Sequence, residues 1–67
     1  MAIARVTEII SGSKKGIEDA IETGVARAAK TLKNVEGTWV KDIKTIVKKG
    51  KVVEWRVTMM VTFVVED

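Results

Sequence analysis

Two side chains in the second half of the chain are suited to binding chemistry. Trp39 lies in the stretch NVEGTWVKDI and is one of only two tryptophans, in a sequence with one phenylalanine and no tyrosine. A tryptophan near the start of a predicted strand either packs at an interface between chains or offers a flat surface on which a planar ligand stacks. Arg56 lies on the polar side of the last predicted strand. Its guanidinium can bind an anion, stack on an aromatic plane, or form an ion pair with Glu54 or Asp42.

The sequence offers few groups for catalysis. It contains no histidine and no cysteine, which excludes zinc sites, thiol nucleophiles and disulfides. Serine occurs only in a predicted turn and cap, and no glycine-rich loop of the phosphate-binding kind is present. Glu18, Asp19 and Glu22 share a helix surface, but their spacing indicates solvated charge and not a calcium loop. We therefore expect neither an enzyme nor a metal site.

Length and charge limit the class of protein. The 67 residues make one domain, residues 1–67, and a domain of this size buries only about 60% of its unfolded surface. Without disulfides or a metal, association with other chains is the remaining source of stability. The net charge of +3 is mildly basic, but the densest lysine cluster, Lys48–Lys51, is explained by a tight turn, so we expect no nucleic-acid binding. No apolar run approaches the ~20 residues of a membrane span and no signal peptide is evident, which predicts a cytoplasmic protein.

The first half of the sequence predicts a strand and a helix. Residues 2–10 are rich in β-branched side chains and are followed by SGS, which predicts a strand and then a turn. Ser13 is of the type that caps helix N-termini. A helix of about 19 residues follows, with acids before bases as the helix dipole favours, and it ends by Asn34 and Gly37. Its apolar face consists of Ile17, Ile21, Val25, Ala28 and Leu32, with Gly24 beside it.

The second half predicts a β-hairpin. KKGK forms the turn, with Gly50 placed for a positive φ. All seven odd positions from Val53 to Val65 are apolar, whereas the even positions are mostly polar, so one side of this strand is buried. On the partner strand, simple alternation places Val40 and Ile46 on one face. The other face then carries Gly37, Trp39, Lys41, Ile43 and Thr45.

The last strand is longer than the helix that would cover it. Its roughly 15 residues extend over about 50 Å at 3.3 Å each, whereas the helix extends over about 28 Å at 1.5 Å each. Part of the apolar side, either Val61, Phe63 and Val65 or Val53 and Trp55, must be buried by another chain, which predicts obligate oligomers. The order of elements predicts an α+β fold, β-α-β-β, in which a three-stranded antiparallel sheet folds around one helix and the last strand is central.

The same segments resemble those of a known family, the dodecins. Residues 12–34, GSKKGIEDAIETGVARAAKTLKN, are similar to the dodecin helix and its preceding turn, and residues 50–63, GKVVEWRVTMMVTF, resemble the final dodecin strand. The order and length of the elements agree over nearly the whole chain. The matching positions are Gly12, Ser13, Ile17, Glu18, Asp19, Ala20, Leu32, Asn34, Gly50, Lys51, Val52, Val57 and Phe63.

The resemblance implies a hollow homododecamer in the cytoplasm that sequesters a flavin, FMN or riboflavin, and catalyses no reaction. Dodecins stack flavin rings in pairs between tryptophans of symmetry-related chains, and a glutamine of the last strand binds the flavin edge. Here Gly37 occupies the tryptophan position and Arg56 the glutamine position, while Trp39 lies two residues, about 6.6 Å, farther along the same strand face. Lys44 occupies the position of a basic residue of the family. The resemblance thus gives four candidate ligand-binding residues: Trp39, Arg56, Lys44 and Gly37.

Two hypotheses follow for the function. In the first, the chain is a non-enzymatic binding and storage protein for a small planar or anionic ligand, with flavin as the family ligand and Trp39 as a shifted stacking platform. In the second, it is a structural dodecameric assembly without flavin, in which Trp39 and Arg56 pack at interfaces. Calcium or another ion is the possible ligand of such an assembly, since some dodecin-like proteins that lack the stacking tryptophan are associated with calcium.

Overall fold

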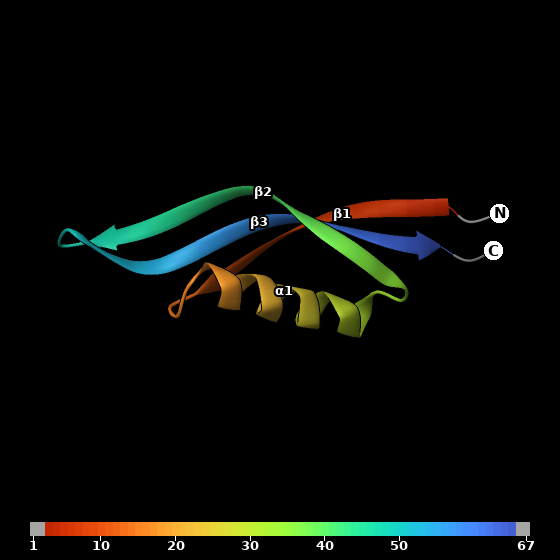
Figure 1. Ribbon diagram of the computed structural model, residues 1–67, viewed down its shortest axis with the longest axis horizontal. Helices are drawn as coiled ribbons and strands as arrows, with labels where there is room; N and C mark the ends of the chain where they lie inside the picture. The colour runs from red at the N-terminus through yellow and green to blue at the C-terminus, as the bar shows by residue number, and fades with distance from the viewer. Residues whose placement is uncertain (1–2, 66–67) are drawn as a thin grey trace.

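The strand formed by the last third of the sequence lies in the middle of the molecule. The computed structural model describes residues 3–65, and these form β1 (Ile3–Ser13), α1 (Ile17–Thr31), β2 (Val35–Lys48) and β3 (Lys51–Val65). The three strands make one antiparallel sheet in the order β1-β3-β2. Figure 1 shows α1 lying along one face of this sheet. The predicted α+β architecture, with the last strand central, is confirmed.

The core forms where the odd positions of β3 meet the helix. Val57, Met59 and Val61 are fully buried, and Ala20 of α1 is fully buried against Val57 and Met59. The buried helix residues are Ala20, Gly24 and Ala28, spaced one turn apart, so small side chains let the helix approach the sheet closely. The predicted apolar face is therefore only partly right, since Ile17 remains 37% exposed at the margin of the contact.

The turn between β2 and β3 agrees with its sequence. Lys48 pairs with Lys51, and the two residues between them have positive φ, 53° at Lys49 and 76° at Gly50. This is the two-residue turn whose twist matches that of antiparallel strands, and it favours glycine at the second position. The predicted positive φ at Gly50 is confirmed.

The connection from β1 to α1 differs from the prediction. β1 does not stop at SGS, because Gly12 and Ser13 still pair with Arg56 and Trp55. The helix N-cap is Gly16, with no side-chain cap, so the expectation that Ser13 caps the helix is wrong. The Ser13 hydroxyl instead accepts hydrogen bonds from the backbone N–H of Lys15 at 2.9 Å and of Gly16 at 3.4 Å. It donates to Asp19 Oδ2 at 2.6 Å, which ties the strand end to the first helical turn.

A bulge in β2 reverses the predicted facing of half of that strand. Val40 pairs with Met59 and Asp42 pairs with Thr58, so Lys41 is an extra residue without its own partner. An extra residue reverses the in-and-out alternation beyond it. Ile43 and Thr45, expected beside Trp39, therefore lie on the helix side opposite Val57 and Trp55. Ile46, expected beside Val40, lies on the other side opposite Glu54.

The helix is too short to cover the sheet, as predicted, but the uncovered region differs in part. α1 has 15 residues and extends over about 22 Å, in a molecule 52 Å long. Val61 is fully buried within its own chain, so it does not belong to the uncovered stripe. Val53 does, at 37% exposed, and the hairpin reaches beyond the helix at one end of the molecule (Figure 1).

The close approach at Gly24 predicts a large effect of a side chain there. A Cβ at this position would lie 2.5 Å from Met59 Cε and 2.9 Å from Ser11 Cβ. Gly24→Val should lower the free energy of unfolding by about 2 kcal/mol, since either the helix or the core must shift. Urea unfolding followed by circular dichroism, at one protein concentration, measures the change.

Ala26→Val is the matched control, because residue 26 is exposed on the same helix. It should lose no more than about 0.7 kcal/mol, from helix propensity alone. Equal losses in the two variants would contradict a packing limit at Gly24.

Candidate functional site

The face of the sheet that points away from α1, here called the outer face, carries all four candidate ligand-binding residues. Residues that pair across antiparallel strands lie on the same face, so the register assigns each of them. In the order β1, β3, β2, three successive rows of the outer face are Glu8–Met60–Trp39, Ile10–Thr58–Asp42 and Gly12–Arg56–Lys44. Trp39, Lys44 and Arg56 are thus brought to one surface, which simple alternation along β2 did not predict.

Trp39 is available for contact with another molecule. Its side chain is 52% exposed, and its cross-strand neighbour is the half-buried Met60. Beside it, Lys41 Nζ lies 3.2 Å from Glu8 Oε1, so this ion pair bridges the outer strands. Both partners are about half exposed, and the pair therefore contributes well under about 1 kcal/mol. Trp39 is not part of the core of its own chain.

Gly37 lies on the same face, one row farther from Arg56. It pairs with Thr62, and a Cβ built on it would meet nothing within 4 Å. The prediction that Trp39 and Gly37 project from one face of the strand is confirmed. A side chain at position 37 would therefore enter open space above the sheet.

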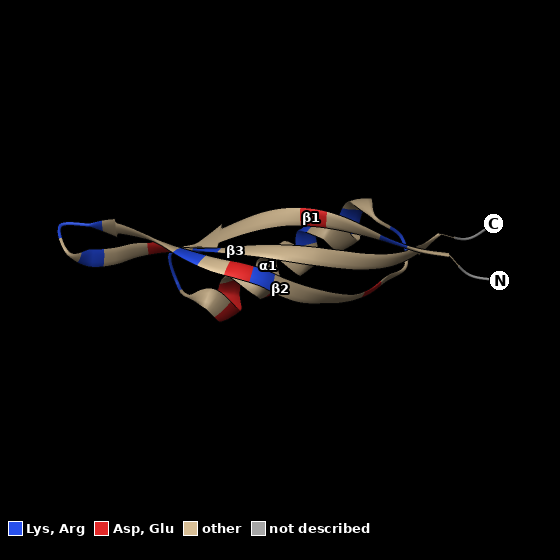
Figure 2. Cartoon of the chain, turned by 90° about the horizontal axis from the view of Figure 1, so that it is seen from above, with Lys and Arg blue, Asp and Glu red and all other residues tan. Residues whose placement is uncertain are grey.

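The guanidinium of Arg56 forms a hydrogen bond through one of its three nitrogens, Nε. Its Nε donates to Glu54 Oε2 at 2.8 Å, as one of the predicted alternatives had it. Glu54 reaches this position over Gly12, where a Cβ would lie 2.6 Å from Glu54 Oε2. Lys44 lies directly across from Arg56, so two cations are adjacent on the outer face. Figure 2 shows positions of both charge signs along the strands and lysines at the hairpin.

Apolar side chains of β1 complete the outer face, and sequence reasoning missed them. Val6 is 46% exposed and Ile10 69% exposed, and both pair with β3 residues of the outer face. The signal was present, because polar and apolar residues do not alternate cleanly in ARVTEIIS. Only the register of β1 against β3 shows that Ile9 enters the core while Ile10 remains outside.

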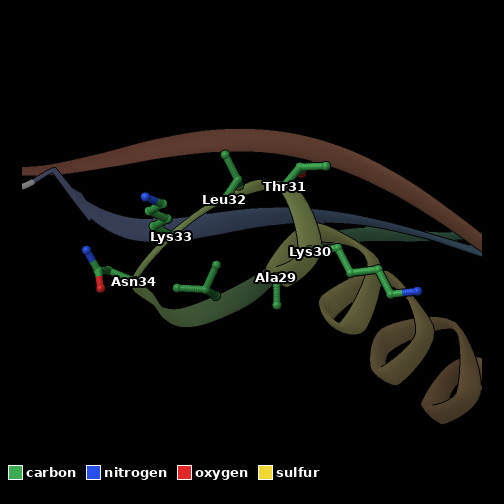
Figure 3. A pocket seen from close by; sticks show the side chains of 7 residues that line it. Ala29, Lys30, Thr31, Leu32, Lys33 and Asn34 are labelled. Atoms are coloured by element: carbon green, nitrogen blue, oxygen red, sulfur yellow. The ribbon is translucent and has the colours of Figure 1, made fainter.

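A separate pocket lies at the far end of the helix. It has a volume of about 530 Å³ and is lined by residues 29–35, as Figure 3 shows. The chain turns there through Asn34, which has φ 61°. The side-chain Nδ2 of Asn34 donates to the backbone carbonyl of Val64 at 3.3 Å. The backbone carbonyl of Asn34 accepts from the Val64 N–H at 3.1 Å. None of the four candidate ligand-binding residues lines this pocket.

A family model, a curated relative and solved structures all assign this chain to the same protein family. The family model described as Dodecin matches residues 3–66. This chain belongs to the dodecin family. The curated dodecin of Thermus thermophilus is 32% identical over 65 residues, which cover 97% of this chain and 94% of the relative.

Solved dodecins have the same fold as this chain. The dodecin from Streptomyces davaonensis is 33% identical with a TM-score of 0.93, over 98% of this chain and 97% of that one. An arginine-to-alanine variant of the Thermus thermophilus dodecin is 31% identical with a TM-score of 0.94 over the whole of both chains. The β-α-β-β dodecin fold is therefore shown from both sequence and structure.

Two further observations concern other classes of site. Within residues 3–65, no helix is long and apolar enough to cross a membrane. In the same part of the chain, no three acidic side chains gather in a group that could hold a metal ion.

Proposed function

We propose that this dodecin-family chain is a non-enzymatic, homo-oligomeric protein that binds and stores a small, flat, anionic molecule, with a flavin as the ligand class. The resemblance to dodecins supports flavin, a hollow dodecamer and a cytoplasmic location. The observation that carries the proposal is Trp39, half exposed on the same face as Lys44 and Arg56. A planar ring can stack on the indole while cationic side chains on this face interact with its polar groups.

Trp39 takes the stacking role in this proposal. The family tryptophan position holds Gly37, which provides no aromatic surface but leaves open space beside Trp39 on the same face. A flavin ring has a large apolar face, and covering both this face and the indole removes apolar surface from water. Trp55 is unsuited to the role, because it pairs with Ser13 and Thr45 on the helix side of the sheet.

Assembly is the second part of the proposal. Val6, Ile10 and Trp39 leave apolar surface exposed on the outer face, and a domain of this size has little stability to spare. Another copy of the chain that covers this face would bury the apolar side chains and enclose the ligand between two sheets. The same exposed surface favours the second candidate function, a structural assembly in which Trp39 packs between chains without a ligand.

A flavin titration distinguishes ligand binding from assembly alone. When FMN or riboflavin is added to the protein, the fluorescence of both the flavin and the tryptophan should be quenched. An excited ring loses its fluorescence by transferring energy or an electron to a ring stacked on it. Trp39→Ala should weaken binding by about 5- to 150-fold, since stacking on an aromatic side chain is worth about 1–3 kcal/mol. Gly37→Trp should strengthen binding, because the added ring meets no obstacle at its Cβ.

Trp55→Phe is the control for the titration, because it removes the other tryptophan from the helix side of the sheet. Binding in this variant should stay close to that of the original protein. Absence of quenching with micromolar flavin in the unchanged protein would reject the flavin proposal and leave the structural assembly.

Assembly can be tested at Ile10, whose side chain is 69% exposed in the single chain. Ile10→Lys alters a side chain that is mostly exposed in the single chain, but it would place a charge in an apolar interface if another copy covers the outer face. We expect the variant to dissociate to smaller species in sedimentation velocity at micromolar concentration. Thr23→Lys, at an exposed helix position, is the control and should leave the assembly intact. An undisturbed oligomer with lysine at position 10 would show that the outer face near β1 is not an interface.

A further inference from the structure

The hairpin end of the molecule has no covering element in its own chain. β1 ends at Ser13, which pairs with Trp55, and the chain then turns into α1. Beyond this point β2 and β3 continue as a two-stranded ribbon, residues 46–54, here called the hairpin arm (Figure 1). A hairpin of two strands is only marginally stable in water by itself. The hairpin arm therefore needs a surface on which to pack.

One side of the hairpin arm is apolar. Val47 pairs with Val52, and the alternation along β2 from Thr45 places this pair on the helix side of the sheet. Both valines are exposed in the single chain, and so is the neighbouring Val53. The helix that covers this side farther along the sheet does not extend over them. A partner of the hairpin arm must therefore offer an apolar surface.

The tip of the hairpin arm is basic. Lys48, Lys49 and Lys51 are exposed, and none of them forms a salt bridge within residues 3–65. Glu54 supplies the one carboxylate of the arm, and it is engaged with Arg56. Lysine has a long aliphatic stem, so its ammonium group can reach a carboxylate at the border of an apolar contact. The complementary partner is apolar at its centre and acidic at its border.

The first half of α1 carries a surface of this kind, here called the helix flank. Ile17, Ile21 and Val25 are spaced by four residues and so lie on one side of the helix. Ile17 is exposed and the other two are half-buried. Glu18 and Glu22 are exposed, and each lies three residues before a member of the apolar row. The two carboxylates therefore border this row, and neither forms a salt bridge in the part of the chain that the structure describes.

The hairpin arm and the helix flank of one chain do not cover each other. Figure 1 shows the arm extending past the start of α1 and away from the helix. The arm can therefore pack on the helix flank of a second copy, in a head-to-tail contact of the kind that closes into rings. Lys14 and Lys15 precede the helix and oppose the attraction near Glu18. Glu22, one turn farther along, is then the stronger partner for the lysines.

We propose that the hairpin arm of one copy docks on the helix flank of a second copy, with its valines on the apolar row and its tip lysines beside Glu22. The proposal rests on the assembly part of the function proposed above, and it adds an interface separate from the outer face. Apolar surface and charge are complementary in this contact. It uses neither Trp39 nor a bound ligand.

Charge reversal followed by charge exchange tests the contact. Lys49→Glu combined with Lys51→Glu should raise the dissociation constant of the assembly at least about tenfold at low salt, because like charges then face each other in every contact. Glu22→Lys alone should also weaken the assembly. All three substitutions together should restore it, since opposite charges face each other again. Sedimentation velocity over a series of protein concentrations measures the constant, and circular dichroism checks that each variant is folded.

Lys33→Glu is the matched control, because Lys33 is exposed beyond the other end of the helix, and it should leave the assembly unchanged. An assembly that tolerates the hairpin reversal, or that the exchange does not restore, would overturn this inference and leave the outer-face interface and flavin binding standing. Restoration by the exchange in a protein that quenches no flavin would support the inference and reject the ligand. Sedimentation of the unchanged protein as a single copy would overturn it, whatever the flavin titration gives.

Discussion

The burial of one side of β3 against α1 is the contact on which the rest of the structure depends. Val57, Met59 and Val61 are fully buried there, and the small residues Ala20, Gly24 and Ala28 let the helix lie close. Since side chains alternate along a strand, a slip of one residue would expose this entire set. The contact therefore sets which side of β3 faces out. Through the pairing of β1 and β2 with β3, it also assigns every other strand residue to a face.

The bulge at Lys41 decides what the outer face can do. Without it, Trp39 and Lys44 would project from opposite sides of β2, because their positions in the sequence differ by an odd number, five. The extra residue brings both to the face of Arg56. The same reversal turns Ile43 inward, toward Val57. One local irregularity thus places an aromatic and two cationic side chains on one face, while Ile43 lies on the helix side and remains 49% exposed.

The outer face also explains why a chain of this size is expected to associate. The helix covers one side of the sheet for less than half of its length, and the other side has no covering element among residues 3–65. Val6, Ile10 and Trp39 leave apolar surface there, interspersed with the Glu8–Lys41 and Glu54–Arg56 ion pairs. Such a mixed surface is typical of interfaces, whose apolar patches are bordered by polar groups. In the proposed function, ligand binding and assembly use one surface, so a ligand is held only where copies meet.

Sequence alone determined the class of fold, the central position of β3, the side of β3 that faces the core and the turn at Gly50, because these follow from short-range periodicity and from backbone sterics. It also pointed to Trp39 and Arg56 through residue type, and to Lys44 and Gly37 through family resemblance. Tertiary structure decided which of these residues share a face. The bulge at Lys41, the continuation of β1 through Ser13 and the exposure of Ile10 each depend on pairing between strands that are far apart in the chain. A local pattern carries no information on such pairing, since the same residues are compatible with either face until a partner strand sets the register.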